Sequence, residues 1–157
     1  MAEVLVYHHI QGLTEGVHAF ADDLRQAGHT VHAPDLFDGR TFDSIEEGFG
    51  YAREAGLDAI REQGIEMADD LGPGLVYGGF SFGVTIAQQL AQTRPGARGA
   101  LLVYSCLPVA EFAGAWPEGR AGPDPRQGSR RVLRRGPAGR TRARRSDGGR
   151  RAVRLPR

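Results

Sequence analysis

Residues 77–91 read YGGFSFGVTIAQQLA, and this stretch decides the fold of the chain. The apolar run GLVYGG at residues 74–79 is typical of a buried strand, and the residues after Ser81 are typical of a helix that ends near TRPG. A buried helix face is predicted for four residues at helical spacing: Val84, Ala87, Leu90 and Ala91. The stretch therefore predicts a strand that turns sharply through a serine into a helix.

The rest of the first 119 residues predicts the same alternation of strands and helices. Strands are expected in EVLVYHH (3–9), in the segment that ends at Pro34, and in GALLVYSC (99–106); helices are expected in residues 14–29 and 44–71. Thr14 is positioned to cap the first of these helices and Gly28 to terminate it. Four glycines within 44–71 leave open whether that helix is continuous. Strands joined by helical crossovers predict a parallel sheet covered on both faces, with ligands at the carboxyl ends of the strands.

Residues 79–83, Gly-Phe-Ser-Phe-Gly, match G-x-S-x-G, the pattern that mounts a nucleophilic serine on a strained turn between a strand and a helix. A chain with 23 glycines can also contain this pattern as a glycine-rich turn with an inert serine. The predicted strand before it and helix after it favour the nucleophile. Such a serine needs two backbone N–H donors for the developing oxyanion, and the sequence offers Phe82 and, within HHIQG, Ile10.

Three stretches carry a family resemblance: residues 4–42 (VLVYHHIQGLTEGVHAFADDLRQAGHTVHAPDLFDGRTF), 77–91, and 101–109 (LLVYSCLPV). They resemble the dienelactone hydrolase family, small cytoplasmic α/β hydrolases that open lactones and related esters. The resemblance implies a three-layer α/β-hydrolase-type parallel sheet of about four strands, truncated, and no cofactor. It assigns Ser81 as nucleophile, with the oxyanion hole formed by the backbone of Ile10 and Phe82. Founding members carry cysteine at the nucleophile and glutamate where this chain has His9.

The general base is the open question, because all five histidines precede Ser81 whereas this fold places its base after the last strand. His8 or His9, at the neighbouring strand end, is an alternative base, and His9 is a candidate auxiliary group. A metal site at this pair is disfavoured, because adjacent strand residues point to opposite faces. A flavodoxin-like phosphate site in HHIQGLTEG lacks the glycine spacing of a phosphate loop.

The single cysteine and the hydropathy pattern bear on the compartment. Cys106 has no partner for an internal disulfide, which fits a reducing cytoplasm, and we expect it to be a small buried residue at a strand end. No run of eighteen apolar residues is present, so we expect neither a membrane span nor a membrane partner. The expected ligand is a small ester or lactone, and the oligomeric state is left open.

The net charge of +1 hides a sharp division of the chain. Residues 1–119 hold six arginines and 17 acidic residues, whereas residues 120–157 hold 14 arginines and two aspartates, and the chain contains no lysine. The second segment has almost no apolar residues and no strand or helix period. We therefore divide the chain into a partial hydrolase domain (1–119) and an arginine-rich tail (120–157), expected to be disordered or frame-shifted.

Three interpretations of the tail compete: a disordered arginine segment that binds nucleic acid non-specifically, a divergent terminus, and translation in a shifted frame. Lysine-free, arginine-rich sequence with glycine and proline is typical of a GC-rich gene read out of frame. Our hypothesis is that residues from about Arg120 onward are such a reading of the half that would carry the catalytic Asp and His. Activity of this chain is then expected to be impaired. The alternative is a non-enzymatic remnant with a nucleic-acid-binding tail.

The frame-shift hypothesis predicts that the protein isolated from its native host is heavier than the 16.9 kDa of this sequence. Intact-mass spectrometry measures this directly. A native mass equal to that of the sequence contradicts the hypothesis, and resequencing the gene around codon 120 is the independent check.

Overall fold

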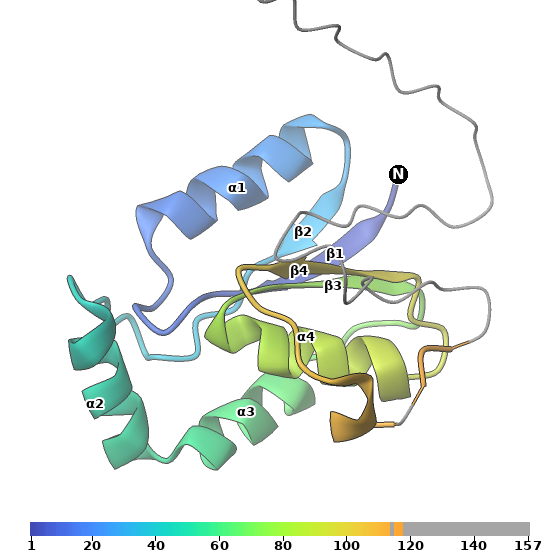
Figure 1. Ribbon diagram of the computed structural model, residues 1–157. Helices are drawn as coiled ribbons and strands as arrows, with labels where there is room; N and C mark the ends of the chain where they lie inside the picture. Colours follow the sequence, from blue (N-terminus) through green and yellow to red (C-terminus); the bar gives the residue numbers. More distant parts are fainter. Residues whose placement is uncertain (114, 118–157) are drawn as a thin grey trace, which may run out of the picture.

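The computed structural model describes residues 1–113 and 115–117 of the chain (Figure 1). The strands are β1 (Glu3–Tyr7), β2 (Thr30–His32), β3 (Leu75–Phe80) and β4 (Gly99–Val103). The helices are α1 (Glu15–Gln26), α2 (Ile45–Ala55), α3 (Leu57–Glu66), α4 (Phe82–Thr93) and the short 3₁₀ helix η1 (Val109–Glu111). The arginine-rich segment 120–157 lies outside the described residues, so the expectations about it remain predictions.

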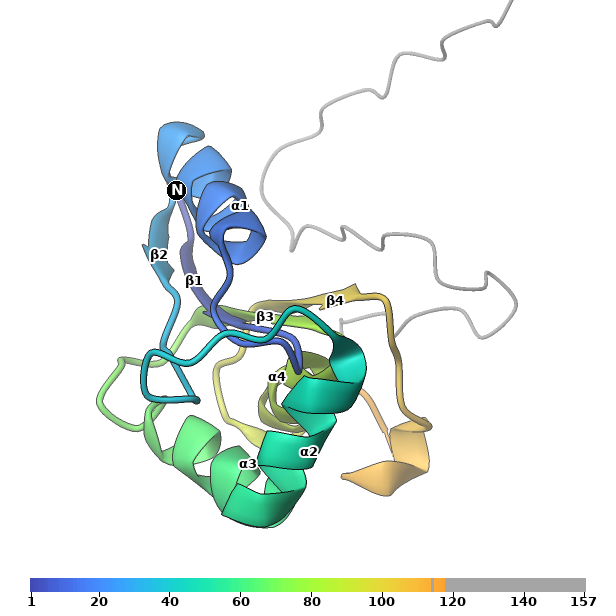
Figure 2. The same ribbon diagram turned by 90° about the vertical axis from the view of Figure 1, so that its left-hand side faces the viewer.

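The four strands form one parallel sheet in the order β2-β1-β3-β4. Strands β1 and β3 pair along five residues, from Glu3 opposite Leu75 to Tyr7 opposite Gly79. Because the strands run in the same direction, the loop after β1 and the serine turn after β3 lie at the same edge of the sheet (Figure 2). The parallel α/β sheet predicted from the sequence is confirmed.

The two faces of β1 pack into two separate cores, as the alternation of side chains along a strand requires. Val4 and Val6 pack on α1, whereas Leu5 and Tyr7 join the larger core formed with α3 and α4. Figure 1 shows α1 on one side of the sheet and α2, α3 and α4 on the other. The sheet is therefore the middle of three layers.

The helix boundaries agree with the sequence predictions at some points and differ at others. Gly28 follows α1 with φ of 87°, the left-handed terminator that was expected. Thr14 occupies the N-cap position of α1, but its hydroxyl makes no capping hydrogen bond. The acidic stretch forms two helices rather than one, because Gly56 between α2 and α3 has φ of 92°. Strand β2 ends at His32, two residues before the expected Pro34.

The segment after β4 is held by two buried glutamines of α4. The side-chain amide of Gln88 donates to the carbonyl of Leu107 and accepts from its N–H, both at 2.9 Å. Gln92 donates to the carbonyls of Val109 (2.9 Å) and Ala115 (3.2 Å). These bonds satisfy amides that would otherwise be costly to bury. They tie the chain beyond the sheet back onto α4.

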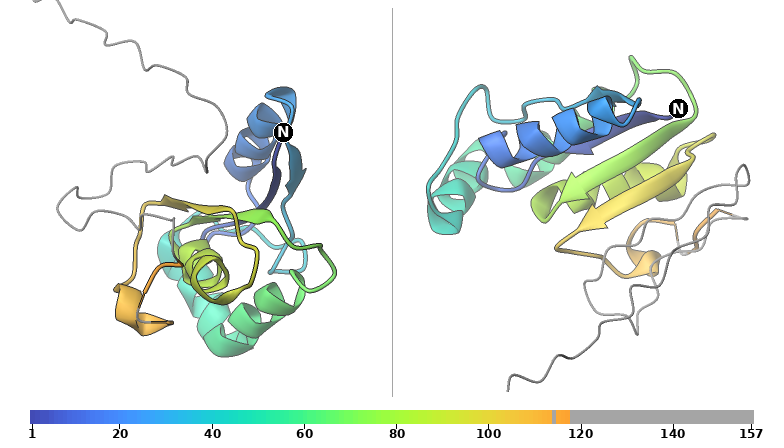
Figure 3. Two further views of the ribbon diagram at one scale, coloured as in Figure 1. Left: turned by 90° about the vertical axis from the view of Figure 1, so that its right-hand side faces the viewer. Right: turned by 90° about the horizontal axis from the view of Figure 1, so that it is seen from above.

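Cys106 is exposed, so the expectation of a buried cysteine was wrong. Strand β4 ends at Val103, three residues earlier than the expected strand end, and every residue of β4 is only half-buried. Figure 3 shows the reason on one face: α1 lies over β1 and β2 and leaves β4 visible from above. Cys106 therefore follows a half-covered strand instead of entering a core.

Helix α2 packs its backbone against the loop after β1. A Cβ atom at Gly48 would lie 2.1 Å from the carbonyl oxygen of Ile10, so only glycine permits this approach. Ser44 and Glu47 form a reciprocal capping box that fixes the start of the helix. Gly50, on the same helix, has open space around the corresponding position.

We therefore predict opposite effects for two glycine substitutions on α2. Gly48→Ala must displace the Ile10 loop and should lower the free energy of unfolding by about 1–3 kcal/mol, as overpacking does. Gly50→Ala, the matched control, should raise it by about 0.5–1 kcal/mol through helix propensity. Urea denaturation followed by circular dichroism measures both. Equal effects of the two substitutions would contradict the close approach of α2 to Ile10.

Candidate active site

The serine turn between β3 and α4 has the geometry that the G-x-S-x-G pattern predicts. Ser81 is exposed and has φ of 47° and ψ of −104°, a backbone conformation that is strained for any residue with a side chain. A Cβ atom at Gly79 would lie 2.3 Å from the carbonyl oxygen of Gly83. The N–H of Ser81 donates to the carbonyl of Val103 on β4 at 2.8 Å. The turn is thus fixed by the strand beside it.

The start of α4 lies directly against the end of β1. A Cβ atom at Gly83 would approach the carbonyl oxygens of Tyr7 and His8 to 2.5 and 2.6 Å. This contact brings the first turn of α4, with Phe82 at its first position, to the loop that carries Ile10, and the side chains of both residues belong to the same core. The positive end of the α4 dipole therefore faces the region around Ser81.

The backbone N–H groups of Ile10 and Phe82 are candidates for binding an oxyanion. Within residues 1–113 and 115–117, neither N–H donates a hydrogen bond. Gly12, with φ of 94°, closes the loop by donating its N–H to the carbonyl of His9 at 3.0 Å. Both candidate donors thus belong to short, tightly packed backbone turns at the same edge of the sheet.

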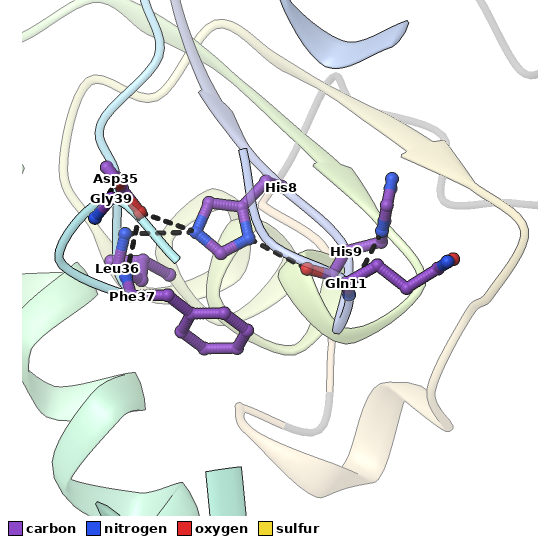
Figure 4. Close-up of polar contacts among 7 residues, drawn as sticks. All are labelled: His8, His9, Gln11, Asp35, Leu36, Phe37 and Gly39. Carbon is purple, nitrogen blue, oxygen red and sulfur yellow. Dashed lines mark hydrogen bonds and ion pairs between the residues drawn. The ribbon is translucent and has the colours of Figure 1, made fainter. Parts of the chain in front are cut away.

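His8 is fully buried and occupies a polar niche between the loops after β1 and β2 (Figure 4). The N–H of Leu36 donates to its Nε2 at 2.9 Å, so the proton of the neutral ring is on Nδ1, which lies 2.7 Å from the carbonyl oxygen of His9. Burial lowers the pKa of His8, outweighing this carbonyl and Asp35, which both favour the charged ring. Asp35 Oδ1, 3.6 Å from Nε2, therefore faces a neutral imidazole.

The structure rules out the alternative of His8 as a general base, because both ring nitrogens are hydrogen-bonded and the ring is fully buried. His9 stays a prediction as an auxiliary group. Its Nδ1 accepts from the N–H of Gln11 at 3.2 Å, and its Nε2 lies 3.2 Å from the hydroxyl of Thr14. Burial lowers the pKa of His9, so this ring too favours the neutral form.

The other three histidines contribute nothing to the serine turn. His29 accepts from the N–H of Ala2, and His32 contacts Glu3, both at the end of the sheet opposite Ser81. His18 lies on α1, which covers the far face. In the described part of the chain, no histidine hydrogen-bonds Ser81, and no three His, Cys, Asp or Glu side chains are grouped to hold a metal ion.

No described helix has the length and apolar character of a membrane span.

Solved structures were found that share the fold of this chain. A protein designated m3DLH matches with a TM-score of 0.51 and 23% identity over 66% of this chain and 47% of its own length. A protein from Xanthomonas campestris pv. campestris, described as a candidate hydrolase of the α/β superfamily, matches with a TM-score of 0.50 and 22% identity, over 74% of this chain and 68% of that protein. The chain spans about half the length of m3DLH.

The likeness establishes an α/β-hydrolase-type fold, as the sequence predicted. No protein-family model and no curated protein matches the chain. At these identities the similarity concerns the fold, so the chemistry has to be argued from the residues of the site.

The sequence alone suggested His8 only as an alternative base or as a disfavoured metal ligand, and its structural role was not predicted. One signal was present: His8 continues the buried apolar run of β1, where an imidazole must find hydrogen-bond partners for both nitrogens. Its partners, the carbonyl of His9 and the N–H of Leu36, come from two loops, and the second lies 28 residues away in sequence. That pairing is visible only in the folded chain.

The buried neutral state of His8 predicts a pH dependence of stability. Unfolded, the imidazole has a pKa of about 6.5 and binds a proton below that pH; folded, its pKa is lower and it stays neutral. The unfolded state therefore gains protons, and stability falls as the pH drops below about 6.5, with a limiting slope of about 1.4 kcal/mol per pH unit.

The measurement is the free energy of unfolding of the wild type minus that of His8→Asn, between pH 7.5 and 5. We expect this difference to decrease as the pH falls, because only the wild type must keep the buried imidazole neutral. His9 is present in both proteins and cancels. A difference that is constant with pH would show that folded His8 accepts a proton freely.

Proposed function

We propose that this chain carries the acylating site of a hydrolase similar to the dienelactone hydrolase family, which acts on small esters or lactones through Ser81. The observation that carries the proposal is the exposed Ser81 in a strained, positive-φ turn between two glycines that admit no Cβ atom. Strain of this kind persists where the surrounding structure enforces it, and it clusters at active sites.

The proposed reaction is acyl transfer in two steps. The Ser81 oxygen bonds to the carbonyl carbon of the substrate, and the alcohol group leaves with the proton lost by the serine; water then cleaves the acyl-serine ester and releases the acid. The oxyanion of each tetrahedral intermediate is assigned to the N–H groups of Ile10 and Phe82. In a lactone, the leaving alcohol and the acid stay in one molecule.

The base that removes the serine proton is proposed to be absent from the described residues. No described histidine hydrogen-bonds Ser81, and both nitrogens of His8 and of His9 already have partners. We propose that turnover is slow, at about the 1000-fold acceleration over water that binding and an oxyanion hole retain in triad knock-outs. The proposed compartment is the cytoplasm, where a free thiol such as exposed Cys106 stays reduced.

We predict that a fluorophosphonate probe labels the full chain at Ser81 slowly, because the oxyanion hole assists the attack of the serine although no described base removes its proton. Ser81→Ala should abolish the labelling. Ser105→Ala, which removes another serine at a strand end, should leave the labelling rate unchanged. Peptide mass spectrometry locates the adduct. Labelling that is absent from the wild type, or equal in Ser81→Ala, would overturn the proposed function.

A further inference from the structure

We infer that His8 is a positioning residue for the oxyanion hole: it holds the peptide group between His9 and Ile10 so that the Ile10 N–H points at the reacting carbonyl oxygen. The inference rests on the proposed function of Ser81 and extends it to a residue that never touches the substrate. It follows from the hydrogen bonds of the buried imidazole (Figure 4).

The direction of the Ile10 N–H follows from the geometry of the peptide group between His9 and Ile10. The carbonyl of His9 and the N–H of Ile10 belong to the same planar trans peptide, so they point in opposite directions. The His9 oxygen accepts two hydrogen bonds, from Nδ1 of His8 at 2.7 Å and from the N–H of Gly12 at 3.0 Å. A peptide whose oxygen is held in this way has its N–H direction fixed as well.

The imidazole of His8 is itself held in one orientation. Leu36 donates its N–H to Nε2 at 2.9 Å, the ring of Phe37 packs edge-on with a centroid distance of 4.8 Å, and His8 is 0% exposed. Leu36 and Phe37 follow β2, and Asp35 stabilises their turn by accepting from the N–H groups of Phe37 (2.8 Å) and Gly39. The imidazole thus anchors the β1 loop to the β2 loop.

The fixed orientation of the Ile10 N–H affects the reactivity of Ser81. A donor that is oriented before the reaction costs no reorganisation when the oxyanion forms, and this preorganisation is the main source of its effect. Gly12 closes the turn locally, whereas His8 ties the same carbonyl to the sheet and to a second loop. Loss of the Nδ1–H donor frees the peptide to rotate away from the site while the fold remains.

Two substitutions of similar size and polarity separate the two hydrogen bonds of the ring. His8→Asn places an amide nitrogen near the Nδ1 position, keeps the donor to the His9 carbonyl and loses the acceptor for Leu36. His8→Gln places an amide oxygen near the Nε2 position, keeps the acceptor and loses the donor. The measurement is the rate at which a fluorophosphonate modifies Ser81 in the full chain, divided by the folded fraction from circular dichroism.

We expect His8→Gln to react at least about 10-fold more slowly than the wild type, a partial version of the about 100- to 1000-fold loss on deleting a donor. His8→Asn should stay within about threefold of the wild type, although it loses the Leu36 bond. Equal rates for the two variants would overturn the positioning role. A wild type that is not labelled would overturn the proposed function, and the role of His8 with it.

If neither variant folds, nitrogen-15 NMR of the wild-type protein tests the positioning role of His8. In nitrogen-15 spectra, Nδ1 of His8 should carry the proton, and phosphonylation of Ser81 should move the amide proton of Ile10 downfield as it binds the phosphonyl oxygen. An unprotonated Nδ1, or an Ile10 amide that does not respond to the adduct, would overturn the inference while leaving Ser81 as the labelled residue.

Discussion

The contact between the first turn of α4 and the end of β1 is the constraint on which the rest of the site depends. At Gly83 the helix backbone meets the carbonyl oxygens of Tyr7 and His8 so closely that no Cβ atom fits. A Cβ atom at Gly79 would in turn collide with the backbone of Gly83. Because the first turn of α4 lies this close to the end of β1, Ser81 cannot connect β3 to α4 in an unstrained backbone conformation. Its positive φ is the geometric result, and the close packing of the interior maintains it.

The same contact between α4 and β1 also contributes to the burial of His8. Its carbonyl faces Gly83 and its side chain is enclosed, so the imidazole is far from water and its nitrogens must find partners within the protein. The carbonyl of His9 and the N–H of Leu36 provide them and select one neutral tautomer. Burial lowers the pKa of His8 more than Asp35 raises it, so the imidazole stays neutral. Its two hydrogen bonds connect the loop after β1 to the loop after β2.

The sheet is supported unevenly, and the difference matters for the proposed chemistry. Strand β1 is buried between two cores, and the residues that would bind an oxyanion lie in the loop that follows it and in the turn after β3. Strand β4 is half-buried along its whole length, and the chain beyond it is held by Gln88 and Gln92. The assigned nucleophile and donors therefore lie on the well-packed part of the sheet.

The sequence by itself determined the alternation of strands and helices, the parallel sheet, the serine turn and the buried face of α4, because periodicity and glycine spacing are local properties. Its expectation of a buried Cys106 was wrong, and it did not predict the structural role of His8, because burial and hydrogen-bond partners depend on segments distant in the chain. Only the tertiary structure decided that Gly48 meets Ile10 and that Leu36 reaches His8. The physical reason is that a backbone contact between remote segments leaves no signature in local propensity, whereas a strand, a turn and a helix do.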